Sequence, residues 1–225
     1  MKEGSIGKGW KRVGILFSAA ACAMGFTMTS CARMPYTTKT VHDDERVVVT
    51  VQREIEPQTY THPIQLTSAE LAAILKGFSV REDQRLPLRW FAEELPPKPL
   101  FRHDEIEALT PHLSDALQQL SPNERAHFEV RGPGNNPRYG RDTVAGWMAV
   151  RDPHLYLKIE YFHNQIAIRK SDNYDYNYPL TPPTPKTYIL YFEPGRFWVT
   201  DGQGTRAVDY REFLKSGQAG GTITR

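Results

Sequence analysis

The sequence predicts an α+β fold, with one antiparallel sheet of about five or six strands and two or three helices on one face. Two segments in the first half show the apolar period of helices. The second half instead contains short, alternating segments that are typical of strands. The turns between these segments are too short for crossover helices, so successive strands are expected to pair antiparallel and to be covered on one face.

The first predicted strand and helix lie between residues 46 and 77. Residues 46–52 contain a run of five β-branched side chains, which is typical of a strand. Residues 67–76 predict a helix, because Thr67 and Glu70 have capping-box spacing and apolar residues follow at helical intervals. Gly77 is expected to end this helix.

A second helix is predicted for residues 103–120, where leucines and an isoleucine form one apolar stripe. Thr110 and Pro111 predict a restart inside this segment, as N-cap and first helical residue. The four prolines of residues 79–101 predict an irregular connection between the two helices.

The second half of the chain reads as a meander of strands joined by short turns. Asp152-Pro153 and His163-Asn164 supply turn residues at hairpin-like separations. Residues 193–196, with proline followed by glycine, fit a type II turn. The glycine-rich residues 132–140 are followed by a strand pattern, so they predict a sheet connection and not a phosphate cradle. The predicted strands are residues 127–130, 144–150, 155–161, 165–169, 188–192 and 197–200.

Charge is distributed unevenly along the 225 residues. The formal net charge is +2, but residues 1–30 hold four basic side chains and one acidic one. The remaining chain therefore carries 24 basic and 25 acidic residues, a net charge of about −1. Nucleic-acid binding would require a basic face or stripe, so we expect no nucleic-acid partner.

Residues 1–30 have the order of a secretory signal peptide. A positive segment from Lys2 to Arg12 precedes twelve mostly apolar residues, 15–26, and small and hydroxyl residues follow up to Cys31. The apolar segment is shorter than the roughly 20 residues that a membrane-spanning helix needs. An uncleaved leader that anchors a single-pass membrane protein remains an alternative.

Met28-Thr29-Ser30-Cys31 resembles the lipobox of bacterial lipoprotein precursors, although Met28 replaces the usual leucine. The resemblance implies that diacylglycerol is joined to Cys31 by a thioether and that the leader is cut just before it. Cys22 is the competing cysteine, but too few apolar residues precede it for a signal peptide. With Cys22 removed and Cys31 modified, the mature chain contains no thiol, which suits an oxidising compartment.

The resemblance also implies a location and a division of the chain. Acyl chains on Cys31 would attach the protein to the membrane of the bacterial cell envelope, with the domain facing the periplasm. Ala32 after the cysteine implies the outer membrane more than the inner one. Residues 1–30 are then the lipoprotein signal peptide, 31–45 the acylated cysteine and a tether, 46–215 a single α+β domain and 216–225 a flexible tail.

Catalytic and metal-binding patterns are weak. The sequence has no GxSxG motif, and we assign no catalytic, cofactor or metal residue. Glu93-Glu94 and Asp104-Glu105 are the visible carboxylate pairs, and we expect both to be solvated. A cell-wall hydrolase that uses dispersed carboxylates remains the enzymatic alternative. The histidines are expected at the surface or at strand ends; they are His62, His103, His112, His127, His154 and His163.

The most unusual segment is residues 171–186, which has no periodicity. In it Tyr174, Tyr176 and Tyr178 alternate with Asp175 and Asn177, a mixture that suits adaptable contacts. The three tyrosines are therefore candidate contacts to an envelope protein or glycan, the alternative being that they cover a sheet edge. Taken together, the sequence predicts an envelope lipoprotein whose domain binds or scaffolds, with no cofactor.

Overall fold

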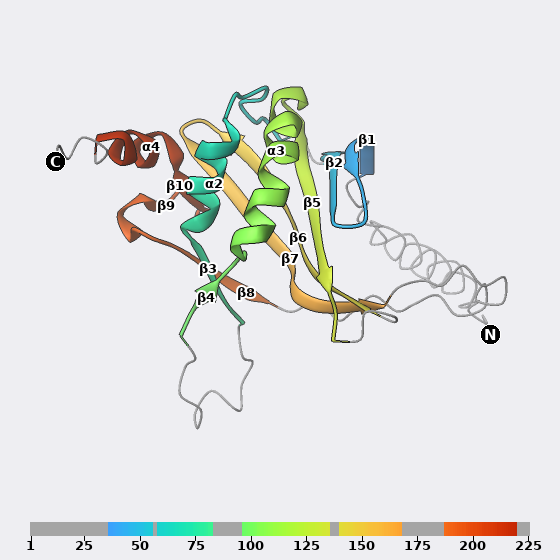
Figure 1. Ribbon diagram of the computed structural model, residues 1–225. Helices are drawn as coiled ribbons and strands as arrows, with labels where there is room; N and C mark the ends of the chain where they lie inside the picture. Colours follow the sequence, from blue (N-terminus) through green and yellow to red (C-terminus); the bar gives the residue numbers. More distant parts are fainter. Residues whose placement is uncertain (1–35, 56–57, 83–95, 136–139, 168–186, 220–225) are drawn as a thin grey trace, which may run out of the picture. The chain divides into compact units, whose positions relative to one another are not determined.

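The computed structural model describes residues 36–55, 58–82, 96–135, 140–167 and 187–219. These residues belong to one compact unit, Pro35–Arg225. Within them, a seven-stranded sheet and a three-stranded sheet combine with three α-helices, and every strand pair is antiparallel (Figure 1). The predicted α+β fold with an antiparallel sheet is therefore confirmed.

The large sheet has the strand order β1-β2-β5-β6-β7-β10-β9. Its middle is a simple succession, because β5, β6 and β7 pair in chain order through β5–β6 and β6–β7. β2 comes next to β5 through a long connection that contains α2, the small sheet's first strands and α3. The strands are β1 (Tyr36–Asp43), β2 (Val47–Arg53), β5 (Glu124–Pro133), β6 (Gly140–Arg151), β7 (His154–Ala167), β10 (Arg206–Asp209) and β9 (Trp198–Thr200).

The small sheet has the order β4-β3-β8. Aromatic rings join it to the rest of the domain, because Phe78 of β3 lies 5.0 Å from Phe192 of β8 and 5.9 Å from Trp198 of β9, between ring centroids. Phe213 of α4 lies 5.1 Å from Phe192 in an edge-to-face arrangement. The strands are β4 (Lys98–Pro99), β3 (Phe78–Glu82) and β8 (Tyr188–Phe192).

The helices α2 (Ser68–Lys76) and α3 (His103–Gln119) lie over the same face of the large sheet (Figure 1). α3 packs on β2 and β5, α2 packs on α3, and α4 (Tyr210–Ala219) packs on β7 and β10. Alternate residues of β2 and β5 face α3, as the period of two requires. The buried side chains of this interface are Val47, Val49, Val51, Ala126, Phe128, Val130, Ile106, Leu109, Leu113 and Leu117.

Several boundaries differ from the sequence-based expectations. Residues 36–43 were assigned to the tether but form β1, an edge strand that pairs with β2. Residues 79–101 were expected to be irregular, yet they supply most of β3 and all of β4. α3 runs through Pro111 without a restart. α4 extends to Ala219, into the predicted tail, and residues 220–225 lie outside the described part of the chain.

The predicted strand pairs at the end of the meander were also wrong in part. β7 is continuous across His163-Asn164, where a turn was expected. β8 and β9 do not form a hairpin, because β8 pairs with β3 and β9 pairs with β10. The short η3 helix (Gly195–Phe197) takes the chain from one sheet to the other. These differences arise because a short strand is recognisable locally, whereas its pairing partner is chosen by distant residues.

Candidate functional site

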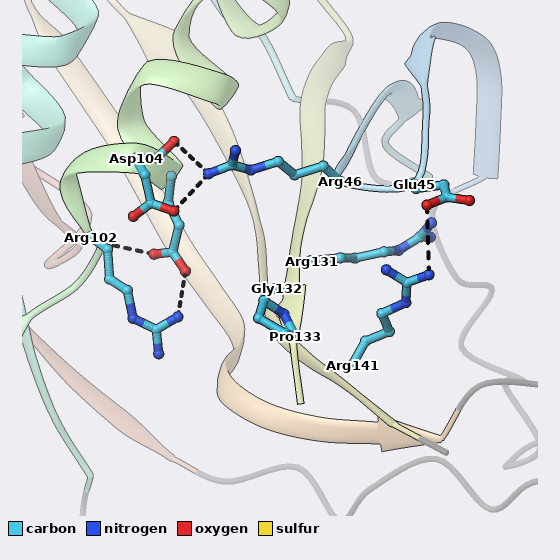
Figure 2. Close-up of a pocket in the computed structure, with 9 residues that line it drawn as sticks. Glu45, Arg46, Arg102, Asp104, Arg131, Gly132, Pro133 and Arg141 are labelled. Atoms are coloured by element: carbon cyan, nitrogen blue, oxygen red, sulfur yellow. Dashed lines mark hydrogen bonds and ion pairs between the residues drawn. The ribbon is translucent and has the colours of Figure 1, made fainter. Parts of the chain in front are cut away.

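A cleft of about 570 Å³ opens where the turn between β1 and β2, the N-terminus of α3 and the β5–β6 hairpin meet (Figure 2). Four arginines and three carboxylates line it, together with a glycine and a proline. We call it the arginine cleft. Its lining residues are Glu45, Arg46, Arg102, Asp104, Glu105, Arg131, Gly132, Pro133 and Arg141.

The β1–β2 turn is held by Asp44. Its Oδ1 accepts hydrogen bonds from the backbone N–H groups of Arg46, at 2.7 Å, and Val47, at 2.6 Å. These bonds, that to Val47 first, together with the bond to His42, lower the pKa of Asp44 to about 2. Asp44 is thus ionised at neutral pH, and the turn presents Glu45 and Arg46 side by side at the cleft.

The N-terminus of α3 forms the opposite wall. Oε2 of Glu105 accepts the backbone N–H of Arg102 at 2.8 Å, and its Oε1 lies 3.3 Å from Nη1 of the same arginine. Asp104 is exposed and receives Nη2 of Arg46 at 2.6 Å (Figure 2). The expectation that Asp104-Glu105 is a solvated pair is therefore wrong for Glu105, which is buried because it caps the helix.

Arg131 and Arg141 come from the two strands of the β5–β6 hairpin. Arg131 pairs with Thr143 and Pro133 pairs with Arg141, so the two arginines are diagonal neighbours on one face of the sheet. Arg131 is held by Glu129 through two contacts, at 2.9 and 3.1 Å, which raise its pKa. Arg141 reaches Oε2 of Glu45 at 4.0 Å.

Behind the cleft, a second carboxylate joins Glu105. Oδ2 of Asp142 receives Nη2 of Arg102 at 2.8 Å and lies 3.0 Å from Nδ1 of His163. Oε1 of Glu105 lies 4.0 Å from the same Nδ1. Oδ1 of Asp142 is buried and has no hydrogen-bond partner among the described residues. Because Arg102 engages both carboxylates, this arrangement favours a structural role over acid–base chemistry.

The histidines are more varied than expected. His103 is at the surface, and Nε2 of His127 on β5 lies 3.1 Å from Oε2 of Glu160 on β7. His62 is buried, contrary to the expectation. His112 on α3 stacks on His42 of β1, with ring centroids 3.5 Å apart. In the described part of the chain, no group of three or more histidine, cysteine, aspartate or glutamate side chains is placed to hold a metal ion.

The other candidate residues of the sequence analysis cannot be compared with the structure. Cys31, Tyr174, Tyr176 and Tyr178, and the Glu93-Glu94 pair, lie outside the described residues. No sequence motif singled out Arg131 or Arg141 as candidate site residues. Their signal was present, because they flank the turn-rich residues 132–140, and in an antiparallel hairpin two flanking residues become neighbours.

Comparison with known protein families, curated protein sequences and solved structures finds no match to this chain. Among the described helices, none has the length and apolar character needed to cross a membrane. The properties of the arginine cleft therefore rest on its own geometry.

Proposed function

We propose that the protein is a bacterial envelope lipoprotein, attached to the membrane by acyl chains on Cys31, whose α+β domain is a binding module facing the periplasm. The observation that carries the binding role is the arginine cleft. Side chains of both charges converge there from three separate parts of the chain, and the cleft is large enough for a small molecule or a chain end.

The attachment is supported by the leader. A basic segment, twelve mostly apolar residues and Met28-Thr29-Ser30-Cys31 follow one another in the order of a lipoprotein precursor. Two or three acyl chains contribute about 0.8 kcal/mol for each buried methylene, which is enough for durable anchoring. Ala32 supports the outer membrane as the location. Strand β1 starts five residues after Cys31, at Tyr36, so the link between anchor and domain is short.

The attachment is tested by expressing the full chain in a bacterial host with labelled palmitate. We expect label on the unchanged chain and none on Cys31→Ala, with Cys22→Ala as the matched control that keeps the label. Globomycin, which blocks the lipoprotein peptidase, should cause a labelled, uncleaved precursor to accumulate. An unlabelled chain that retains the mass of its leader would instead support a single-pass membrane protein.

A further inference from the structure

We propose that the arginine cleft binds its ligand through an oxyanion, a carboxylate or phosphate group, held between the guanidinium groups of Arg131 and Arg141. This inference rests on the proposed function, since it names the chemical class of the ligand that the binding module takes.

The positive charges of Arg131 and Arg141 converge in one corner of the cleft. Arg131 and Arg141 are diagonal neighbours of one antiparallel pair, a separation within reach of long side chains, so their like charges repel each other. Figure 2 shows both side chains extending toward the same corner of the cleft, beside Glu45. An anion in that corner could contact both guanidinium groups at once, and it would offset the repulsion that remains between them.

Arg131 and Arg141 also retain guanidinium N–H donors that no described residue accepts. Glu129 engages Nε and Nη2 of Arg131, which leaves its Nη1 without a hydrogen bond to any described residue. The side chain of Arg141 forms no hydrogen bond within the described part of the chain, and 38% of it is exposed. Guanidinium groups match the geometry of carboxylates and phosphates, often with two parallel hydrogen bonds.

The other two arginines of the cleft differ in this respect. Arg46 reaches Asp104 at 2.6 Å, and Arg102 reaches Asp142 at 2.8 Å, so both are engaged in short, charge-assisted contacts. Arg46 and Arg102 therefore line the cleft with guanidinium groups that are already paired. The oxyanion is therefore assigned to the corner of Arg131 and Arg141 and not to the wall beside α3.

The chain also supplies a weak internal occupant of this corner. The side chain of Glu45 is 92% exposed, and its Oε2 lies 4.0 Å from Nη2 of Arg141, longer than a charge-assisted hydrogen bond. An exposed ion pair of this kind contributes little and is readily exchanged. A ligand oxyanion that approaches more closely would displace Glu45, which makes Glu45 a competitor of the ligand.

The experiment measures the binding of inorganic phosphate and of acetate to the purified full chain in detergent, by isothermal titration calorimetry at pH 7.5 and low ionic strength. Arg141→Gln should weaken binding about tenfold, since it removes a charged hydrogen-bonding partner. Glu45→Gln should tighten binding about threefold, because it removes the competitor. Arg206→Gln, at an exposed arginine of β10 outside the cleft, should leave binding unchanged.

The opposite changes in the two cleft variants make the inference falsifiable even if Arg141→Gln fails to fold, because Glu45→Gln lies in an exposed turn. Binding that ignores both substitutions would mean an adventitious ion only and would overturn the inference, as would the absence of saturable binding. Dependence on Arg141 for phosphate alone, or for acetate alone, would support it and identify the group.

Failure of this inference is distinguishable from failure of the proposed anchor. Cys31→Ala removes the acylation site, whereas every lining residue of the cleft lies at position 45 or beyond. The Cys31→Ala chain should therefore bind phosphate as the unchanged chain does. Lost labelling with retained binding would overturn the anchor alone, and retained labelling without binding would overturn the oxyanion site alone.

Discussion

Nδ1 of His163 lies 3.0 Å from Oδ2 of Asp142, and this contact depends on an irregularity in the sheet. His163 has a φ of 46°, the one positive value among the described non-glycine residues. The β6–β7 register shifts at this point, because Thr143 pairs with Asn164 while Ala145 pairs with Tyr161. The extra residue on β7 forms a bulge, and the bulge directs the imidazole to the carboxylate behind the cleft.

Two substitutions of His163 separate the backbone from the side chain. Asparagine tolerates a positive φ, whereas a β-branched residue does not. We therefore expect His163→Val to lower the free energy of unfolding by about 2 kcal/mol, from backbone strain and the lost hydrogen bond. His163→Asn should cost about half as much, roughly 1 kcal/mol. Urea denaturation of both variants measures the difference, and equal losses would show that the backbone conformation contributes nothing.

The same residue explains one limit of the sequence analysis. His163-Asn164 predicts a turn because both residues accept turn conformations, and His163 does adopt a positive φ. The local conformational preference was therefore correct. A bulge inside a strand and a turn between strands can both require a residue that tolerates a positive φ, so this preference does not distinguish them. Pairing along the whole of β6 decides between them, and that pairing involves residues about twenty positions away.

The arginine cleft was beyond the sequence analysis for a related reason. Its walls come from residues 45–46, 102, 104–105, 131–133 and 141, and only the last two of these segments are joined by a predictable hairpin. The approach of α3 to the β1–β2 turn depends on β1 joining the sheet. Strand β1 is mostly exposed and its residues are mostly polar, so no apolar pattern in the sequence predicts it. The cleft could be found only from the assembled fold.

The start of α2 is the opposite case, because its signal is entirely local. The spacing of Thr67 and Glu70 predicted a capping box, and the structure has it: Oγ1 of Thr67 accepts the N–H of Glu70 at 3.2 Å, and Oε2 of Glu70 accepts the N–H of Thr67 at 2.8 Å. Thr67→Ala should cost about 1 kcal/mol in the free energy of unfolding, while Thr67→Ser should be nearly neutral. A thermal or urea melt compares them; equal stability of all three chains would contradict the cap.

Gly146 occupies a place in β6 where no side chain fits. A Cβ atom there would lie 2.2 Å from the carbonyl oxygen of Lys158 and 3.2 Å from Cα of Ile159, on the neighbouring strand β7. Both are backbone atoms that cannot rotate away. Gly146→Ala should therefore destabilise the domain by roughly 1–3 kcal/mol, the usual cost of overpacking.

Gly195 provides the matched control for this substitution. A Cβ atom at Gly195 would meet no atom within 4 Å, and its φ is not positive. Gly195→Ala should thus leave the midpoint of urea unfolding almost unchanged. If Gly146→Ala were as stable as Gly195→Ala, the close approach of β6 and β7 at Gly146 would have to be relaxed in solution.

His62 should make the stability of the domain depend on pH. Its side chain is buried, and Nε2 accepts the backbone N–H of Val150 at 3.2 Å. Burial lowers the pKa of His62 from 6.5 to about 4. Protonation would place a charge in the interior and replace the acceptor with a donor facing another donor. The unfolded chain therefore takes up this proton more readily than the folded one.

The sign follows from this difference in proton affinity. Between pH 6.5 and pH 4 the unfolded state binds more protons, so stability rises with pH. The contribution of neutral His62 is complete above pH 6.5 and is lost as the pH falls toward 4, by about 3 kcal/mol in all.

His62→Gln, whose amide oxygen can accept the same N–H, should remove most of this slope. His103→Gln, at an imidazole that is 72% exposed, should keep it. The test is the free energy of unfolding in urea, measured from pH 7 to pH 4.5 for the unchanged chain, His62→Gln and His103→Gln. If stability depended on pH equally in the unchanged chain and in His62→Gln, another group would be responsible for the titration.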